Sequence, residues 1–365
     1  MLREALETVL KPGGPWLFVK LVVLAFTAAS VIRLIPVRRK ALRRRQRRRR
    51  TGLSWSAGVL ACLVVSAGCA VVLLGHGGRS PRDEPAARAL SGTLAARPAS
   101  YLGVFEPVQG SSYQPVEHFA ATVGRRPDMV LTYRAWLEPF DAGFADTLHD
   151  HGAEPFIQIE PGDASLTAIA AGRYDAYLRA YATRVREFGH PVILGFAPEA
   201  NGNWYPWGWT RSSPAAWVAA WRHVVTIFRQ QEADNVTWIW TVNESYPGSG
   251  PLRDYWPGAA YVDWAGIDGY YDYRKDTFAR VFGPAVNSIR KLTRKPVLLA
   301  ETAAGQVAGQ ARIIPGLFAG IRRDHLLGLV WFDQAQHSGI HHQDWRLEGH
   351  PAAIAAFRRE VKHYR

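Results

Sequence analysis

Eight short aliphatic runs, each followed by a longer segment, are the feature that most limits the folds open to this chain. The runs are Tyr101–Phe105, Met129–Tyr133, Pro155–Ile159, Val192–Phe196, Val236–Val242, Val262–Ile267, Pro296–Ala300 and Gly328–Phe332. Some, such as Val297–Ala300, are apolar throughout, which is typical of strands buried on both faces of a parallel sheet. We therefore predict a mostly parallel sheet whose strands alternate with helices.

Two of the intervening segments show clear helical periodicity. Residues 174–188 repeat apolar side chains at near-helical spacing, and Ala215–Phe228 does the same after a Ser213-Pro214 start signal. Such aromatic stripes are far more often core than ligand sites. Eight strand–helix units within residues 101–365 predict a (β/α)8 barrel, an α/β fold whose active site lies at the C-terminal ends of the strands.

The positions at these predicted strand ends are acidic and aromatic. They are Glu106, Trp136, Glu160, Glu199, Asn243 with Glu244, Asp268 with Tyr270, Glu301, and Asp333. The chain has no His/Asp cluster with metal spacing, no glycine-rich phosphate loop and no Gly-x-Ser-x-Gly elbow, so we predict neither a metal nor a cofactor. His341, His342 and His350 lack spacing partners and are predicted to be surface residues.

Glu199 and Glu301 are about a hundred residues apart, and each follows an aliphatic run. Paired carboxylates at strand ends favour glycoside hydrolysis, in which one protonates the leaving oxygen and the other attacks or stabilises the anomeric carbon. Trp204, Trp207 and Trp209 crowd the first glutamate and offer flat faces for sugar rings. The predicted partner is therefore a polysaccharide substrate.

Three motifs give residues 101–365 a family resemblance: Glu-Ala-Asn-Gly-Asn-Trp-Tyr-Pro-Trp at 199–207, Ile-Asp-Gly-Tyr at 267–270 and Leu-Leu-Ala-Glu at 298–301. On these motifs the region resembles the catalytic domain of glycoside hydrolase family 26. That is a clan A family of retaining (β/α)8 enzymes, which includes β-mannanases and some xylan- and mixed-linkage glucan-cleaving members. The resemblance implies a β-mannanase-like endo-glycosidase.

The resemblance also implies individual roles. Glu199 matches the acid/base, Glu301 the nucleophile, and Tyr270 the tyrosine that hydrogen-bonds the nucleophile. Trp204 and Trp331 match aromatic positions that contact sugar, and we add as candidate substrate contacts Asn201, Trp136, Asp268 and Trp207. We expect the pKa of Glu199 to be raised by burial against Trp204 and by anionic Glu301, and a Tyr270 donor to keep Glu301 ionised.

Two positions depart from the family pattern. Family mannanases usually carry His immediately before the acid/base and Arg four positions before it, whereas this chain has Pro198 and Gly195. Because Pro198 offers no donor to a substrate hydroxyl, the departure bears on mannan specificity more than on retaining hydrolysis.

The N-terminal region predicts a membrane anchor over residues 1–75. Leu53–Gly75 has no formal charge and is long enough to cross a ~30 Å hydrocarbon core. Trp16–Ile32, interrupted by Lys20, either spans or lies in the interface with Lys20 snorkelling. A cleaved signal peptide fits poorly, because the apolar run is long and starts far from the terminus.

All of the basic excess is also N-terminal. Residues 1–100 hold 18 Lys/Arg and 4 Asp/Glu, which leaves 26 and 27 in residues 101–365, so the large domain has no nucleic-acid-like footprint. The polybasic run is predicted to lie in a cytoplasmic loop, residues 33–51, and this orientation places everything after Gly75 outside the cytoplasm. We also expect the run to contact the anionic headgroups of membrane lipid. Residues 76–100 read as a flexible linker. Cys62 and Cys69 fall in the span, so the outer domain has no disulfide.

The leading interpretation is a membrane-anchored retaining endo-β-glycosidase that acts on an extracellular or envelope polysaccharide. One alternative is a non-catalytic glycan-binding barrel, which Pro198 and Gly195 support. Another is a polysaccharide-assembly component whose polybasic loop contacts a cytoplasmic partner. The sequence leaves the oligomeric state, the sugar, and the choice between endo and exo cleavage open.

Overall fold

The computed structural model describes residues 93–107, 112–335 and 343–364. Within those ranges no helix has both the length and the apolar composition that a bilayer crossing requires. The predicted spans, the polybasic loop, both cysteines, His341, His342 and the linker up to residue 92 lie outside the described residues, so the anchor stays a prediction.

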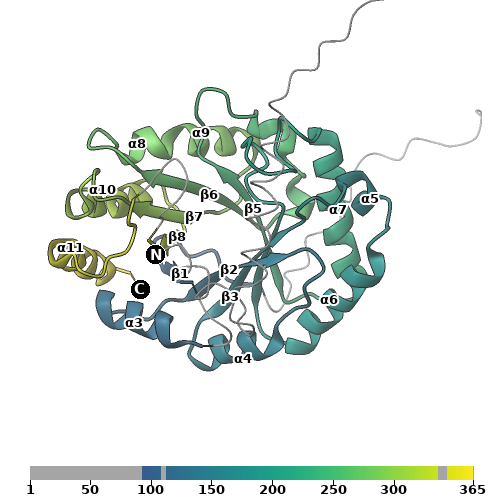
Figure 1. Ribbon diagram of the computed structural model, residues 1–365, viewed down its shortest axis with the longest axis horizontal. Helices are drawn as coiled ribbons and strands as arrows, with labels where there is room; N and C mark the ends of the chain where they lie inside the picture. Colours follow the sequence, from purple (N-terminus) through teal and green to yellow (C-terminus); the bar gives the residue numbers. More distant parts are fainter. Residues whose placement is uncertain (1–92, 108–111, 336–342, 365) are drawn as a thin grey trace, which may run out of the picture. The chain divides into compact units, whose positions relative to one another are not determined.

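The eight predicted strands are confirmed, and they close into a parallel barrel in the order β1 to β8 (Figure 1). Their bounds are β1 Tyr101–Phe105, β2 Met129–Ala135, β3 Glu154–Glu160, β4 Val192–Phe196, β5 Val236–Asn243, β6 Trp264–Tyr271, β7 Val297–Ala304 and β8 Gly328–Phe332. β8 pairs with β1 from Tyr101 beside Gly328 to Phe105 beside Phe332, so the sheet has no free edge. This is the (β/α)8 architecture that the sequence predicted.

Helices surround the barrel (Figure 1). They are α3 Gln114–Val123, α4 Ala142–Asp150, α5 Leu166–Ala170, α6 Asp175–Phe188, α7 Pro214–Gln230, α8 Phe278–Val281, α9 Gly283–Leu292, α10 Gln310–Arg323 and α11 Pro351–Val361, with 3-10 turns η2 Leu252–Tyr255 and η3 Ala259–Tyr261. Both predicted helices are confirmed to within two residues. The Ser213 hydroxyl caps α7 by accepting from Ala216 N–H, as the start signal indicated.

Strand side chains alternate between two cores. Inside the barrel, residues such as Phe156, Ile193, Ile239 and Leu298 pack together, while their chain neighbours pack outward against the helices. The period-2 alternation therefore decides which strand residues can reach the mouth of the barrel, the end where the strands finish.

The flexible linker was predicted to extend to residue 100, and its last residues are instead packed on the barrel. Leu94 N–H donates to Thr237 Oγ1 at 3.0 Å, Tyr101 Oη donates to the Ala95 carbonyl at 2.7 Å, and Ala99 N–H donates to the Leu326 carbonyl at 2.8 Å. Leu94 also packs against the inner core. Backbone hydrogen bonds and apolar burial thus hold residues 94–100 where composition alone indicated a tether.

Candidate active site

Glu199 stands on a strained turn at the end of β4. Ala197 and Glu199 both have left-handed backbones, with φ of 47° and 55°, although neither is glycine. Such conformations cost about 1–3 kcal/mol each and persist only where surrounding contacts fix them. Here Ala197 N–H donates to the Ile159 carbonyl at 2.8 Å and Glu199 N–H to the Thr241 carbonyl at 3.0 Å. The neighbouring strands β3 and β5 therefore fix the turn that presents Glu199.

Two tryptophans hold the same turn from outside. Trp207 Nε1–H donates to the Pro198 carbonyl at 2.7 Å, and Trp217 Nε1–H donates to the Ala197 carbonyl at 3.1 Å. Trp207 was predicted to contact substrate, and this is wrong because its ring is 3% exposed and stacks on Tyr205. It is a positioning residue whose indole hydrogen-bonds the backbone carbonyl that precedes Glu199.

The Glu199 carboxylate accepts two hydrogen bonds. Trp204 Nε1–H donates to its Oε2 at 3.0 Å, and Asn243 Nδ2 donates to its Oε1 at 2.6 Å. Trp204 keeps 42% of its surface exposed, and Tyr246 lies nearly parallel to it at 6.3 Å between ring centroids. The predicted sugar-contacting position of Trp204 is therefore open beside Glu199, with Tyr246 as a second aromatic face that the sequence reading missed.

Glu301 reaches the barrel interior because β7 is irregular. The register places Ile267 beside Leu299 but Asp268 beside Glu301, so Ala300 is an extra residue on β7. Leu298 and Ala300 face inward, and strict alternation after them would turn Glu301 outward. The bulge re-aims it to the mouth. Glu301 was expected just beyond the strand end, and it lies within β7 because the pairing continues to Ala304.

Two tyrosine hydroxyls donate to the Glu301 carboxylate. Tyr270 Oη donates to Oε2 at 2.6 Å, which agrees with its predicted contact, and Tyr133 Oη on β2 donates to Oε1. Tyr133 was missed, although it shares the inward parity of Met129 and Leu131, which could have identified it. The Glu301 carboxylate is thus held from two sides by groups that favour its anion.

An aromatic arc supports these two hydroxyls. Phe105 meets Tyr133 edge to face at 5.5 Å and stacks on Phe332 at 4.3 Å, and Phe332 meets Tyr270 edge to face at 5.7 Å. The arc runs over β2, β1, β8 and β6, so four strands fix the two donors relative to Glu301.

Glu199 and Glu301 interact electrostatically. Burial, followed by the Glu199 carboxylate, raises the pKa of Glu301 to about 8, while the two tyrosine hydrogen bonds oppose the rise. Since part of the rise comes from the charge on Glu199, protonating Glu199 lets Glu301 ionise more readily. The pair accordingly favours holding one proton, which a division into acid and nucleophile requires.

Two other predicted substrate contacts are structural. Asn201 is fully buried and exchanges hydrogen bonds of 2.9 Å with the backbone of Asn243, so its amide is not available to a ligand. Trp331 is also fully buried, and it packs on Phe357 of α11 because its parity on β8 points outward. Trp136 is half-buried and packs edge to face on Tyr174 and Tyr177, and its contact with substrate stays a prediction.

Acidic residues near the mouth are in protonation-favouring environments. Asp268 lies fully buried inside β6, which disagrees with the predicted substrate contact, and burial followed by the charges of Glu301 and Glu199 raises its pKa well above the usual range. At β1 and β8, burial followed by the Asp333 charge raises the pKa of Glu106 to about 9. Burial raises the pKa of Glu160, and a hydrogen bond from Tyr205 opposes it.

Gly195 is the position where the family pattern has Arg. A Cβ there would lie 1.9 Å from Gln158 Oε1, and Gln158 Nε2 donates to Thr241 Oγ1 at 2.7 Å. The Gln158 side chain from β3 therefore fills the space over Gly195. The barrel interior beneath Glu199 is built differently from the mannanase pattern.

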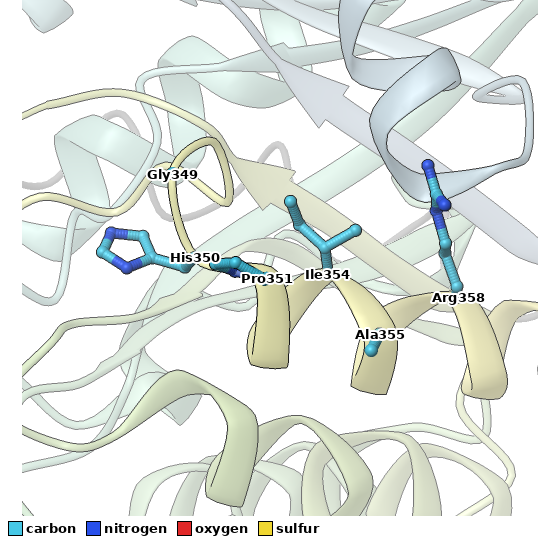
Figure 2. A pocket seen from close by; sticks show the side chains of 6 residues that line it. All are labelled: Gly349, His350, Pro351, Ile354, Ala355 and Arg358. Atoms are coloured by element: carbon cyan, nitrogen blue, oxygen red, sulfur yellow. The ribbon is translucent and has the colours of Figure 1, made fainter.

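The described residues contain no group of three or more His, Cys, Asp or Glu side chains that could hold a metal ion. A shallow pocket at the start of α11 is lined by Gly349, His350, Pro351, Ile354, Ala355 and Arg358 (Figure 2). It lacks a carboxylate and includes none of the residues around Glu199 and Glu301, so the mouth remains the candidate active site.

Comparisons with known proteins cover this part of the barrel. Residues 168–310 match the model of glycosyl hydrolase family 26, a range that includes Glu199 and Glu301. Endoglucanase H of Acetivibrio thermocellus is 31% identical over 267 residues, or 68% of this chain and 29% of that protein. A β-1,3-xylanase of Vibrio sp. is 33% identical over 101 residues, or 27% of this chain and 21% of that protein. The chain thus spans less than a third of either relative.

Solved structures share the fold. The catalytic domain of a Bacillus sp. JAMB-750 family 26 endo-β-1,4-mannanase superposes with a TM-score of 0.57 at 16% identity, covering 72% of this chain and 85% of that one. A Cellulomonas fimi endo-β-1,4-mannanase gives 0.57 at 16% identity, covering 72% and 70%.

Proposed function

We propose that this barrel, whose residues 168–310 match the model of glycosyl hydrolase family 26, cleaves a β-linked polysaccharide with retention of configuration. The single observation that carries the proposal is the arrangement of the two glutamates. Glu301, on the bulged strand β7, accepts hydrogen bonds from two tyrosine hydroxyls. It also interacts electrostatically with Glu199, which stands on a strained turn. Neither feature has an evident packing role.

In the proposed mechanism, Glu199 gives its proton to the glycosidic oxygen while the Glu301 carboxylate attacks the anomeric carbon, so the leaving sugar departs as an alcohol. The Glu199 carboxylate then removes a proton from water, which attacks the same carbon and releases Glu301. Trp204 places an exposed indole edge and face beside the leaving group. Tyr133 and Tyr270 stabilise Glu301 as the anion before attack and after release.

The relatives' names and the departures at Pro198 and Gly195 support our proposal for the substrate class. The relatives' names include an endoglucanase, β-1,3-xylanases and endo-β-1,4-mannanases. Pro198 and the Gln158-filled space differ from the mannanase pattern, so we favour a β-glucan or another envelope polysaccharide over mannan. We further propose, from residues 1–75, that the protein is held in the cell membrane with the barrel outside the cytoplasm.

The test is hydrolysis by the detergent-solubilised full chain of mixed-linkage glucan, mannan, glucomannan, xylan and bacterial exopolysaccharides, with Glu199→Ala and Glu301→Ala in parallel. We expect cleavage of one polymer by the native chain alone, with the β-anomer as the first product seen by NMR. If all three proteins bind one of the polymers and none of them cleaves it, the result would instead support the glycan-binding alternative.

A further inference from the structure

The barrel end opposite the candidate site, here called the floor, is where the strands begin and the helices finish. The described chain enters at this end. Residues 94–100 run beneath the barrel, from Leu94 beside Thr237 at the start of β5 to Ala99 beside Leu326 at the start of β8. Any segment before residue 93 therefore joins the barrel at its floor, and the two glutamates lie at the other end.

One half of the floor is strongly basic. It comprises the C-terminal ends of α9, α10, α11 and α3 together with residues 94–100, and we call it the basic patch. Its members are Arg97, Arg125, Arg126, Arg290, Lys291, Arg294, Lys295, Arg322, Arg323, Arg358, Arg359 and Lys362. All but Arg125 and Lys295 are exposed. Residues 101–365 carry a net charge near zero, so this is a concentration of charge rather than a general excess.

Few carboxylates neutralise the basic patch. Asp128 pairs with Arg125, Asp324 with Arg323 and Glu360 with Arg322. Other members bond to neutral carbonyls: Arg290 donates to the Lys295 carbonyl at 2.8 Å, and Arg358 donates to the Thr122 carbonyl at 2.8 Å. The Arg358 bond satisfies a carbonyl in the last turn of α3, as expected for a cation near a helix C-terminus, and both bonds leave the formal charge of the guanidinium in place.

The other half of the floor lacks this excess. Arg184, Arg186 and Arg229 are accompanied there by six carboxylates, namely Asp150, Glu154, Glu187, Glu232, Asp234 and Asp263. This half also has cations at its helix ends, yet its carboxylates outnumber them, so the basic patch is not simply a result of the usual cations at helix C-termini. Carboxyl groups line the mouth, namely Glu106, Glu160, Glu199, Glu301 and Asp333, and burial raises the pKa of several of them, so the contrast between the two ends comes from the basic patch. The barrel is consequently polar along its axis, with the basic pole beside the point of chain entry.

We infer that the basic patch rests on the anionic headgroups of the membrane in which the chain is anchored, with the mouth turned away toward the polymer. The inference rests on the proposed anchoring. The 18 residues 76–93 between the proposed span and the barrel can reach at most about 60 Å, so the floor cannot leave the neighbourhood of the bilayer. Exposed charges act over a Debye length of about 8 Å at physiological salt, so contact requires the floor rather than the mouth to face the lipid.

The experiment measures energy transfer from the full chain to headgroup-labelled lipid. A single donor is attached at His363→Cys on the floor or at Val307→Cys, a 58% exposed residue near the mouth, in a Cys62→Ser, Cys69→Ser background. The chain is reconstituted in phosphatidylcholine vesicles with or without phosphatidylglycerol. We expect phosphatidylglycerol to raise transfer from the floor label only, and 0.5 M salt to abolish the rise.

The charge test is Lys291→Glu with Arg359→Glu, and the matched control is Arg173→Glu with Arg184→Glu on the α5–α6 side, which changes the net charge equally. None of these four exposed side chains has a hydrogen bond or ion pair among the described residues. We expect the first pair alone to remove the phosphatidylglycerol effect. Equal loss in both pairs, or no lipid dependence in the native chain, overturns the inference.

Flotation of the chain after alkaline wash separates the two proposals. If the chain floats but the floor label ignores phosphatidylglycerol, the anchor stands and the inference falls. If the chain does not float, the anchoring falls, and added phosphatidylglycerol vesicles then decide the inference by binding or not binding the chain at low salt. Binding that a short oligonucleotide displaces equally well would show a general polyanion surface and overturn it.

Discussion

The two sides of the candidate active site hold their glutamates by different means. On the β4 side, Glu199 stands on a left-handed turn that backbone bonds and two buried indoles secure, and its partly exposed carboxylate meets Trp204 and Asn243. On the β7 side, Glu301 is brought in by a bulge and held by two hydroxyls within an aromatic arc. In the proposed mechanism, the group that exchanges protons with substrate and water is thus accessible, whereas the group that attacks the anomeric carbon is buried and oriented.

The largest expected effect distinguishes the two roles. Glu199→Ala should lower kcat/KM for polymer by about 10²–10⁴-fold, the usual contribution of a general acid, and Glu301→Ala should abolish turnover. With an aryl β-glycoside whose leaving group needs no acid, azide should give the β-glycosyl azide from the Glu199 variant and the α-glycosyl azide from the Glu301 variant. The same anomer from both variants would show that the assignment of roles is wrong.

Removing the hydroxyls on the β7 side should have the next largest effect. Hydrogen bonds to a charged group contribute about 1.5–3 kcal/mol, so Tyr133→Phe and Tyr270→Phe should each lower kcat/KM about tenfold or more. Both hydroxyls lower the pKa of Glu301, so each variant should move the acid limb of the kcat/KM profile to higher pH. Tyr246→Phe is the matched control, because it lies beside Trp204 and should leave the limb in place.

A double-mutant cycle sharpens this prediction. If both tyrosines act through Glu301, the acid limb of the double variant should lie above that of either single variant. A lower rate with an unchanged limb would mean that Tyr133 shapes the site without affecting ionisation of the nucleophile.

On the β4 side, Trp207→Phe should disturb the turn without touching substrate. It removes the donor to the buried Pro198 carbonyl, and an unsatisfied buried group costs about 1–3 kcal/mol. We expect a lower Tm and a reduced kcat with little change in KM. The control is Trp209→Phe, since Trp209 is 38% exposed. A change in KM alone would return Trp207 to the substrate-contacting role that the sequence indicated.

The same contrast explains what the sequence could predict. The strands and the positions of the two glutamates could be predicted from the sequence, because aliphatic runs and the residues that follow them are local patterns. Asn201, Trp207 and Trp331 were misread, because their neighbours in sequence are not their neighbours in space, and a single step of parity turns Trp331 into the helix layer. Glu301 faces the mouth only because β7 has a bulge, and Tyr133 on β2 reaches the Glu301 carboxylate across the barrel. Neither fact leaves a local signature.

The last prediction concerns the pH dependence of stability. We expect it to arise on the β7 side of the site, where Glu301 is buried. Because burial and the Glu199 charge raise the pKa of Glu301 from 4.5 to about 8, the folded chain binds a proton more tightly there than the unfolded chain. The resulting stabilisation is fully present below about pH 4.5, declines as the pH rises, and is lost above about pH 8. Glu301→Gln keeps the shape and cannot ionise, so its free energy of unfolding should rise relative to native as the pH increases through that window, by at most about 1.4 kcal/mol for each pKa unit of the shift. Chemical unfolding at pH 5, 7 and 9 measures this, with exposed Glu117→Gln as the control. A difference between Glu301→Gln and native that does not grow with pH would mean that Glu301 is ionised in the free protein throughout, and that the tyrosines outweigh burial.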